Sequence, residues 1–193
     1  KIMGDMNWHA HCGIFTYPFQ VAVNFKVPLL IWGEIFWDIS GMHDFDDTVE
    51  FTNRMRVENN LRGFEWDDVI KNTSLREKDL LWAKFPTDED YRKNKIRGIA
   101  IGNYFKWDPN KNTKMLKEKY NWKESQKPFE RTYRRMSNLD DIYENGVHDL
   151  LKFIKFGYGR ATDHACKDIR SGYMTREEGI KMEKKYDHIR SDD

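Results

Sequence analysis

One short apolar run limits the possible folds of this chain more than any other feature. The run Val27–Trp32 contains no polar side chain, and Gly33 closes it. Such a run is typical of a strand in a parallel sheet, where both faces are buried. The preceding stretch, Trp8–Phe25, predicts a helix that Pro18 would kink or interrupt. A helix followed by a buried strand is half of a βαβ unit, so we predict an α/β fold.

Beyond Gly33 the pattern becomes mainly helical. A strand is expected over Ile96–Ile101 from its strand-like residues, but only weakly, because Gly98 lies within it. Helices are expected from Asp46 or Asp47 to about residue 60, over 65–71, over 79–83 after a Ser74–Glu77 capping box, from Thr87 onward, over 109–120, up to Gly157, up to Gly172, and from Thr175 to about residue 186. We predict the end of an α/β domain over residues 1–45 and a helical region over residues 46–193.

Two of the expected helices carry informative patterns. In the helix before Gly157, apolar residues at i, i+3, i+4 and i+7 predict one buried face, formed by Val147, Leu150, Leu151 and Ile154. In the next helix, residues four positions apart predict a narrow face that permits close helix packing, formed by Ala161, Ala165 and Ile169.

The composition of the 193 residues excludes several classes of protein. Positive and negative side chains nearly balance at a net charge of +1, which gives no support to nucleic-acid binding. The apolar runs are too short to span a membrane. Cys12 and Cys166 lie far apart and form no disulfide framework, which favours a reducing cytoplasm. Because the first residue is Lys1, we expect the sequence to be part of a longer chain.

The segment from residue 155 to residue 179 concentrates groups that suit an anionic, oxygen-rich ligand. Arg160 and Arg170 are expected to lie away from the alanine face, where they would be free to bind phosphate or carboxylate. Tyr158, between two glycines, could stack on a sugar or a base. The alternative is a glycine-capped helix hairpin with solvated charges, including an ion pair between Asp163 and Lys167.

Three further clusters have open interpretations. The first could bind zinc, pack on a helix flank or face a ligand; it comprises Asp5, His9, His11 and Cys12. The second, Gly33 with Glu34, follows the predicted strand, where parallel sheets bind ligands. It could equally be a turn with a solvated acid. The third could hold Mg²⁺, act as a base or cap a helix; it comprises His43, Asp44, Asp46 and Asp47.

Many short stretches together resemble the C-terminal portion of the bacterial N-acetyl sugar amidotransferases. The matching stretches are Gly4-Asp5, Trp8, His11, 13–15, 28–34, Asp46-Asp47 with 49–52, Arg62-Gly63, Asp79-Leu80 with Trp82, Arg97-Gly98, 102–104, Trp107-Asp108 and, most extensively, 146–179. The family's Ser-Gly-Gly-x-Asp-Ser pyrophosphate loop is missing from the sequence. The resemblance therefore implies an incomplete adenine-nucleotide α-hydrolase-like, Rossmann-like domain with a large helical C-terminal region, inactive alone.

The resemblance also implies a reaction, the conversion of an acetamido group on a nucleotide-linked sugar into an acetamidino group. ATP and Mg²⁺ would be required, because the amide oxygen must first be adenylylated before ammonia displaces AMP. Glutaminase and cyclase-like subunits would supply the ammonia. Members serve lipopolysaccharide O-antigen synthesis and the pseudaminic or legionaminic acid pathways of flagellin glycosylation.

Site residues are carried over as expectations of the resemblance. They are Gly33, Glu34 and Asp5 for nucleotide or Mg²⁺; Tyr158, Arg160, Arg170 and Arg176 for substrate; and His164, oriented by Asp163, or His11 for proton transfer. Two alternatives stay open. One is a non-catalytic module that binds a sugar nucleotide or docks a partner. The other is a related enzyme that modifies tRNA, which the near-neutral charge disfavours.

Overall fold

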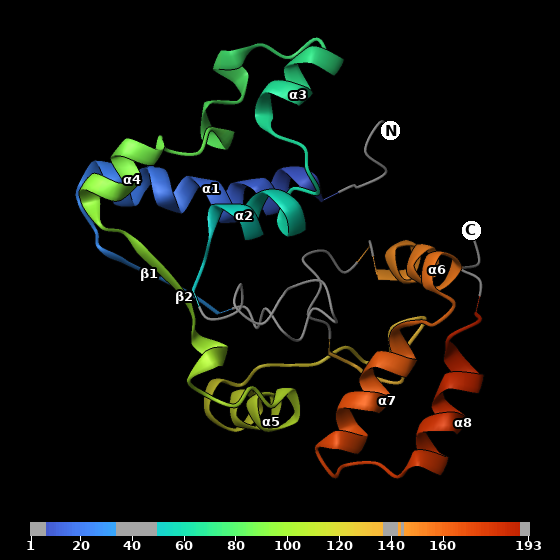
Figure 1. Cartoon of the computed structure of the whole chain (residues 1–193). Helices are drawn as coiled ribbons and strands as arrows, with labels where there is room; N and C mark the ends of the chain where they lie inside the picture. Colours follow the sequence, from blue (N-terminus) through green and yellow to red (C-terminus); the bar gives the residue numbers. More distant parts are fainter. Residues whose placement is uncertain (1–6, 34–49, 137–142, 144, 190–193) are drawn as a thin grey trace. The chain divides into compact units, whose positions relative to one another are not determined.

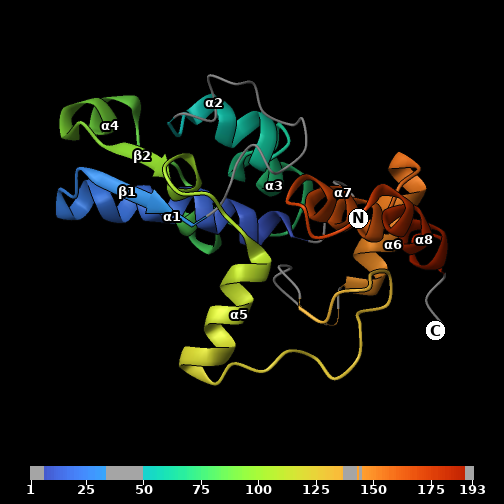
Figure 2. The ribbon, with the colours of Figure 1, turned by 90° about the horizontal axis from the view of Figure 1, so that it is seen from below.

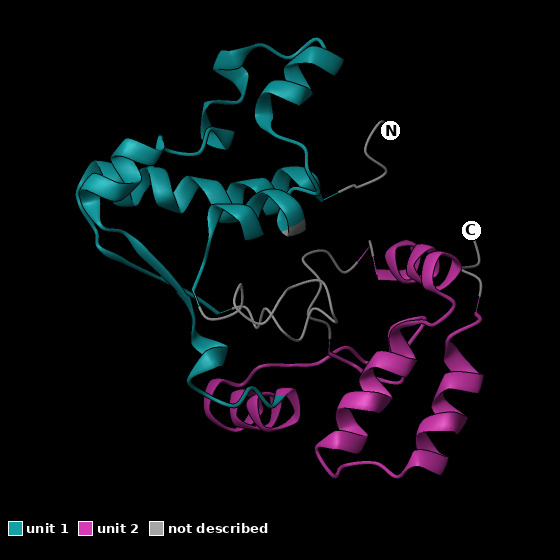
Figure 3. Cartoon of the chain, viewed as in Figure 1, with its two compact units in different colours: residues 1–108 teal, residues 109–193 magenta. Residues whose placement is uncertain are grey.

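The computed structural model describes residues 7–33, 50–136, 143 and 145–189. The chain forms two compact units, residues 1–108 (unit 1) and residues 109–193 (unit 2), which are coloured separately in Figure 3. The predicted boundary between residues 45 and 46 lies outside the described residues. The structure is mixed α/β and mostly helical, as predicted, and the described part of its sheet has two strands.

Unit 1 is built on one long helix and a parallel pair of strands. Helix α1 (Trp8–Phe25) packs against β1 (Leu29–Trp32) and β2 (Arg97–Ala100), and the two strands lie next to each other in both views of the ribbon (Figure 1, Figure 2). The two strands are parallel, and Trp32 lies opposite Ala100 in the register. Both strands and the bounds of α1 agree with the prediction, although a Rossmann-like sheet would need further strands.

Helix α1 continues through Pro18 without interruption. Proline has no backbone N–H, so the carbonyl of Ile14, four residues earlier, loses its helical partner. The indole Nε1 of Trp32 lies 3.4 Å from this carbonyl oxygen and donates to it. The strand therefore supplies the hydrogen bond that the proline removes from the helix.

The core of unit 1 is aromatic. Phe19 is fully buried, and its ring centroid lies 4.8 Å from that of Phe51 and 5.4 Å from that of Trp32. The residues packed around this centre are Phe15, Ala22, Met55, Ile96 and Ala100. A second cluster lies under the N-terminal half of α1 and comprises Trp8, Cys12, Leu61, Leu80 and Ala83. Gly98 is required here, because a Cβ at this position would lie 2.7 Å from the Trp32 ring.

The prediction that β1 is buried on both faces is wrong for the described residues. Trp32 is buried, and Leu30 packs against the core. Leu29 and Ile31 point to the opposite face, because side chains alternate along a strand, and both are exposed. A continuous apolar run does not show by itself how many faces of the strand are covered.

The remaining elements of unit 1 are short. They are α2 (Asn53–Met55), a π-helix (Arg56–Asn60), α3 (Trp66–Asn72), 3₁₀ turns at Glu77–Asp79 and Leu81–Ala83, α4 (Asp88–Asn94) and a 3₁₀ turn at Ile101–Asn103. Thr52 caps α2, since its side chain accepts from the Met55 N–H. The predicted helix start at Asp46 or Asp47 lies outside the described residues. The predicted Ser74 capping box is wrong, because the Asp79 carboxylate accepts from the Arg76 N–H instead.

Unit 2 consists of helices whose ends follow the predicted capping residues. They are α5 (Pro109–Tyr120), α6 (Asn145–Phe156), α7 (Arg160–Arg170) and α8 (Arg176–Tyr186). Gly157 and Gly172 have positive φ, at 77° and 76°, and end α6 and α7. The Thr175–Glu178 capping box begins α8.

Helices α7 and α8 pack closely through small residues, as predicted. Ala161 and Ala165 are buried. A Cβ on Gly179 would lie 2.8 Å from Ile169 Cδ1 and 3.4 Å from Ala165 Cβ. The helices can approach this closely only because Gly179 has no side chain.

Helix α6 is oriented opposite to the prediction. Of the four residues predicted to be buried, Leu150 is half-buried, whereas Val147, Leu151 and Ile154 are exposed, with 70% of Ile154 accessible. Its buried side instead carries Asn145 and Asp149. The helix faces the interior of unit 2 with its polar side because that interior is itself polar. Among the described residues, no helix is long and apolar enough to cross a membrane.

Candidate functional site

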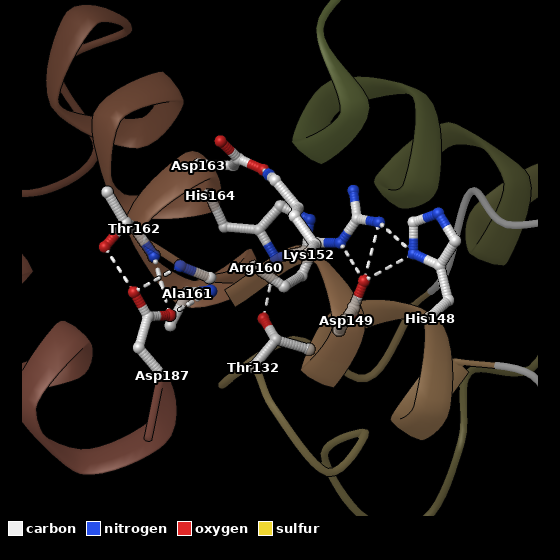
Figure 4. A network of polar contacts seen from close by, with 11 residues as sticks. Thr132, His148, Asp149, Lys152, Arg160, Ala161, Thr162, Asp163, His164 and Asp187 are labelled. Carbon is white, nitrogen blue, oxygen red and sulfur yellow. Dashed lines mark hydrogen bonds and ion pairs between the residues drawn. The ribbon is translucent and has the colours of Figure 1, made fainter. Parts of the chain in front are cut away.

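A polar network connects α6, α7 and the segment after α8 in unit 2 (Figure 4). The first part of this network lies at the N-terminus of α7. The carboxylate of Asp187, which is 1% exposed, accepts from the backbone N–H groups of Gly159, Ala161 and Thr162 at 2.8–3.2 Å. A Cβ on Gly159 would lie 2.7 Å from Asp187 Oδ1, so this position requires glycine. The helix end that would suit a ligand phosphate already binds the protein's own carboxylate.

The second part of the network joins α7 to α6. Arg160 donates from Nε and Nη2 to Oδ1 of Asp149, at 2.9 Å and 2.7 Å. His148 Nδ1 lies 3.0 Å from the same oxygen. Burial by itself raises the pKa of the Asp149 carboxyl, but the hydrogen bonds from His148 and Arg160 outweigh burial, so the pKa lies below its ordinary value. Arg160, predicted to be free for a ligand, is held in a nearly buried ion pair.

The third part of the network surrounds Lys152 on α6. Its ammonium group forms an ion pair with the carboxylate of Asp163 and lies 4.8 Å from the centroid of the Tyr158 ring. Burial, followed by the positive charge of Arg160, lowers the pKa of Lys152 to about 8. Lys152 is therefore a cation of unit 2 that changes protonation close to neutral pH.

His164 lies deeper than its predicted role requires. The side chain is 5% exposed, and Nδ1 lies 2.6 Å from the Thr132 hydroxyl oxygen. Burial, and then the charges of Arg134 and Arg160, lower the pKa of His164 to about 2, so the ring is neutral at physiological pH. The prediction that Asp163 orients His164 is wrong. Asp163 pairs with Lys152 instead, because Asp163 is directed toward α6.

The segment 129–134 completes the interior of unit 2 and was not predicted from the sequence. Asp168 of α7, which is buried, accepts from the Tyr133 hydroxyl, from Arg134 Nη2 at 2.7 Å and from Asn110 Nδ2 at 2.9 Å. The Arg131 guanidinium donates to the Asp187 carbonyl oxygen and lies over the Phe153 ring. Two arginines within four residues were the available signal, but no periodicity indicated that they point inward.

The other predicted site residues lie outside this network. Arg170 and Arg176 are exposed, one at the end of α7 and one at the start of α8. In unit 1, His11 is half-buried on α1 and Gly33 follows β1. Among the described residues, no atom lies within 4 Å of a Cβ built on Gly33. Asp5, Glu34 and the acidic cluster at residues 43–47 lie outside the described residues.

The metal interpretation of the His11 and Cys12 cluster finds no support in the described residues. Cys12 is buried, and its sulfur lies 3.8 Å from the Thr16 hydroxyl oxygen. Burial raises the pKa of the Cys12 thiol to about 11, so it is not a thiolate at neutral pH. No group of three or more His, Cys, Asp or Glu side chains in the described part of the chain is placed to hold a metal ion.

Comparison with known proteins bears on the C-terminal region. No curated protein matches the chain. Residues 129–192 match the family described as LPS biosynthesis protein WbpG-like, C-terminal domain. The matched range includes Arg131, Asp149, Arg160 and Asp187, and so all the contacts that join α6, α7 and α8. The C-terminal region of this chain is therefore similar to the C-terminal domain of WbpG-like lipopolysaccharide biosynthesis proteins.

Proposed function

We propose that this chain acts in bacterial surface-glycan synthesis, as part of an ATP-dependent amidotransferase that converts the acetamido group of a nucleotide-linked sugar into an acetamidino group. The observation that carries the proposal is the similarity of residues 129–192 to a domain of a lipopolysaccharide biosynthesis protein. Within that range, ion pairs with Asp149 and Asp163 hold Arg160 and Lys152 in place, and Lys152 lies over the Tyr158 ring.

In this proposal Arg160 and Tyr158 of the polar network orient the sugar substrate. Arg160 is fixed by two hydrogen bonds to Asp149, so any donor it offers to a ligand is held in place beforehand. Tyr158 is half-buried beside Lys152, and its ring could pack on the sugar. The exposed Arg170 and Arg176 would reach phosphate groups of the carrier.

Proton transfer is better assigned to Lys152 than to His164. His164 is buried, neutral and already hydrogen-bonded at Nδ1. Lys152, with a pKa of about 8, exchanges a proton near physiological pH and so could accept one from the attacking ammonia at Nζ. His11 remains the candidate in unit 1.

ATP would be consumed as a co-substrate that activates the amide oxygen, because an amide carbonyl is too weak an electrophile for ammonia. A nucleotide at the carboxyl end of β1 would lie where ligands of α/β proteins bind, and no described atom is within 4 Å of a Cβ built on Gly33. The described residues supply no carboxylate cluster for Mg²⁺, so we assign no step to the ion. Ammonia-supplying glutaminase and cyclase-like subunits and a cytoplasmic location belong to the same proposal.

The proposal is tested with the protein encoded by the complete reading frame that contains these residues. It is incubated with ATP, Mg²⁺, ammonium and UDP-linked N-acetyl sugars. The expected result is release of AMP and pyrophosphate in equal amounts with a sugar in which mass spectrometry finds NH in place of one oxygen. Release of ADP and phosphate, or AMP release that does not depend on the sugar, would contradict the proposal.

A non-catalytic docking module is the second candidate, favoured by the exposed apolar side chains of α6. Val147, Leu151 and Ile154 lie at helical spacing on the accessible side of that helix. If docking were the whole function, the complete protein would bind its partner and sugar nucleotide without consuming ATP. The assay above separates the two candidates.

A further inference from the structure

An exposed aromatic cluster follows β2 in unit 1. Tyr104, Phe105 and Trp107 are 60%, 68% and 52% exposed. Scattered exposed apolar side chains are common on protein surfaces, but three large rings within four residues are not. Unit 1 can bury aromatic rings, since Phe19, Trp32 and others are buried in its core. Unit 1 therefore has a core that buries aromatic rings, yet these three rings remain outside it.

The cluster lies at the carboxyl edge of the parallel sheet. Strand β2 ends at Ala100, and the 3₁₀ turn at Ile101–Asn103 follows at once. The Ile101 carbonyl accepts from the backbone N–H groups of Tyr104 and Phe105, at 3.0 Å and 3.1 Å. These hydrogen bonds fix the start of the aromatic segment one turn beyond the strand.

The neighbouring strand ends at the same edge of the sheet. Because Trp32 is paired with Ala100, Gly33 continues from β1 at the edge where the aromatic segment continues from β2. Within the described part of the chain, no atom lies within 4 Å of a Cβ built on Gly33. Ligands of α/β proteins bind at the carboxyl ends of parallel strands.

The side chains of the segment suit a ligand that has both a planar ring and a phosphate group. Aromatic side chains provide flat surfaces on which any nucleobase can stack. Lys106 lies within the cluster and is exposed, so a cation is available next to the rings. An uncharged sugar would use the rings but would gain little from the lysine.

We propose that Tyr104, Phe105 and Trp107 form a stacking surface for the base of a nucleotide at the carboxyl edge of the sheet. Lys106 meets the phosphate of the same nucleotide. The choice of a nucleotide as the ligand rests on the proposed function. The inference assigns contacts to residues for which the sequence predicted no role. It requires nucleotide binding, not turnover.

The experiment uses calorimetric titration of the full chain with AMP, adenosine, UMP, uridine and free N-acetylglucosamine. Phe105→Ala is compared with Phe25→Ala, which removes a ring that is 76% exposed at the opposite, amino end of β1. We expect Phe105→Ala to weaken binding of at least one nucleotide and its nucleoside about tenfold. Phe25→Ala should leave binding unchanged. Circular dichroism checks that both variants remain folded.

Lys106→Gln provides the second arm. It should weaken binding of the nucleotide but not of its nucleoside, which separates the phosphate contact from stacking. Equal losses in Phe105→Ala and Phe25→Ala, a loss confined to N-acetylglucosamine, or no nucleotide binding by the wild-type chain would overturn the inference. The proposed function is tested separately, by the products of the amidotransferase assay. The inference can therefore fail while the proposed function stands.

Discussion

The two units of this chain are stabilised by different kinds of interior. Among the described residues, all but two of the buried apolar side chains belong to unit 1, and the exceptions are Ala161 and Ala165. The buried polar side chains show the reverse distribution, because most of them belong to unit 2, including Arg131, Asp149 and Asp187. Apolar burial in unit 1 is non-directional, whereas unit 2 depends on the geometry of hydrogen bonds and ion pairs.

The contrast indicates which unit holds charged side chains in fixed positions. A buried ion pair contributes little net stability compared with apolar packing of the same volume, but loss of one partner is strongly destabilising. The unit with the polar interior therefore holds its charged groups in fixed positions. Its apolar side chains on α6 remain accessible for contacts with other molecules.

The largest expected effect comes from the aromatic core of unit 1. Phe19→Ala should lower the free energy of unfolding by about 3–5 kcal/mol, because it leaves a cavity among Phe51, Trp32 and Phe85. Denaturant unfolding followed by tryptophan fluorescence reports this unit, since six of the seven tryptophans precede residue 109. Phe25→Ala is the matched control and should change stability by less than about 0.5 kcal/mol. Similar losses in the two variants would show that the core is not centred on Phe19.

The next effect concerns two neighbouring positions on α6. Asp149→Asn keeps the volume but removes the carboxylate that pairs with Arg160, which should cost about 3 kcal/mol. Leu151→Gln places a polar group where the structure has an exposed leucine and should cost less than about 0.5 kcal/mol. Hydrogen exchange of peptides from unit 2 measures both. A greater loss in Leu151→Gln would mean that α6 buries its apolar face after all.

The stability of unit 2 should depend on pH through His164, and this effect should be of intermediate size. The pKa of His164 is about 2 in the folded chain and about 6.5 when unfolded, so the unfolded state binds more protons between these values. The stability of unit 2 should therefore fall by about 1.4 kcal/mol per pH unit as the pH drops below 6.5. Stability is retained above that pH.

His164→Asn tests the assignment of this response. Asparagine can accept from the Thr132 hydroxyl but does not titrate, so the slope between about pH 6 and pH 5 should disappear. Hydrogen exchange across a pH series, corrected for the intrinsic exchange rate, is the measurement. An unchanged slope in the variant would assign the acid response to other groups.

The smallest expected effect is on the exposed surface of unit 2. Arg170→Ala should change the free energy of unfolding by less than about 0.5 kcal/mol, because Arg170 is exposed at the last position of α7. Arg160→Ala, which leaves Asp149 buried without its main partner, should cost several times more. Chemical denaturation of the two variants makes the comparison, and equal losses would contradict the division into interior and surface cations.

Local signals predicted the helix ends of unit 2, although the capping box predicted at Ser74 in unit 1 is wrong. Gly157, Gly172 and Thr175 determine helix ends through backbone conformation and hydrogen bonds to residues a few positions away. Strand β1 was predicted from its short apolar run, and β2 was predicted weakly from strand-like residues on either side of Gly98. These features need no knowledge of distant residues.

The interior of unit 2 could not be predicted from such signals. Periodicity in α6 identifies an apolar side but does not say whether that side faces the interior, and here the polar side does. The partners of Arg160 and Asp187 lie 11 and 25–28 residues away in sequence, so no local pattern reveals them. The segment 129–134 has no periodicity, and its arginines look like surface residues.

A double-mutant cycle between Asp149→Asn and Arg160→Gln tests the polar interior most directly. The free energy of unfolding is measured for the wild type, both single variants and the double variant. Fixed, buried partners should show a coupling energy of about 1–3 kcal/mol, because the second substitution costs little once the first has broken the pair. Additive losses, within about 0.5 kcal/mol, would contradict the claim that buried ion pairs organise unit 2.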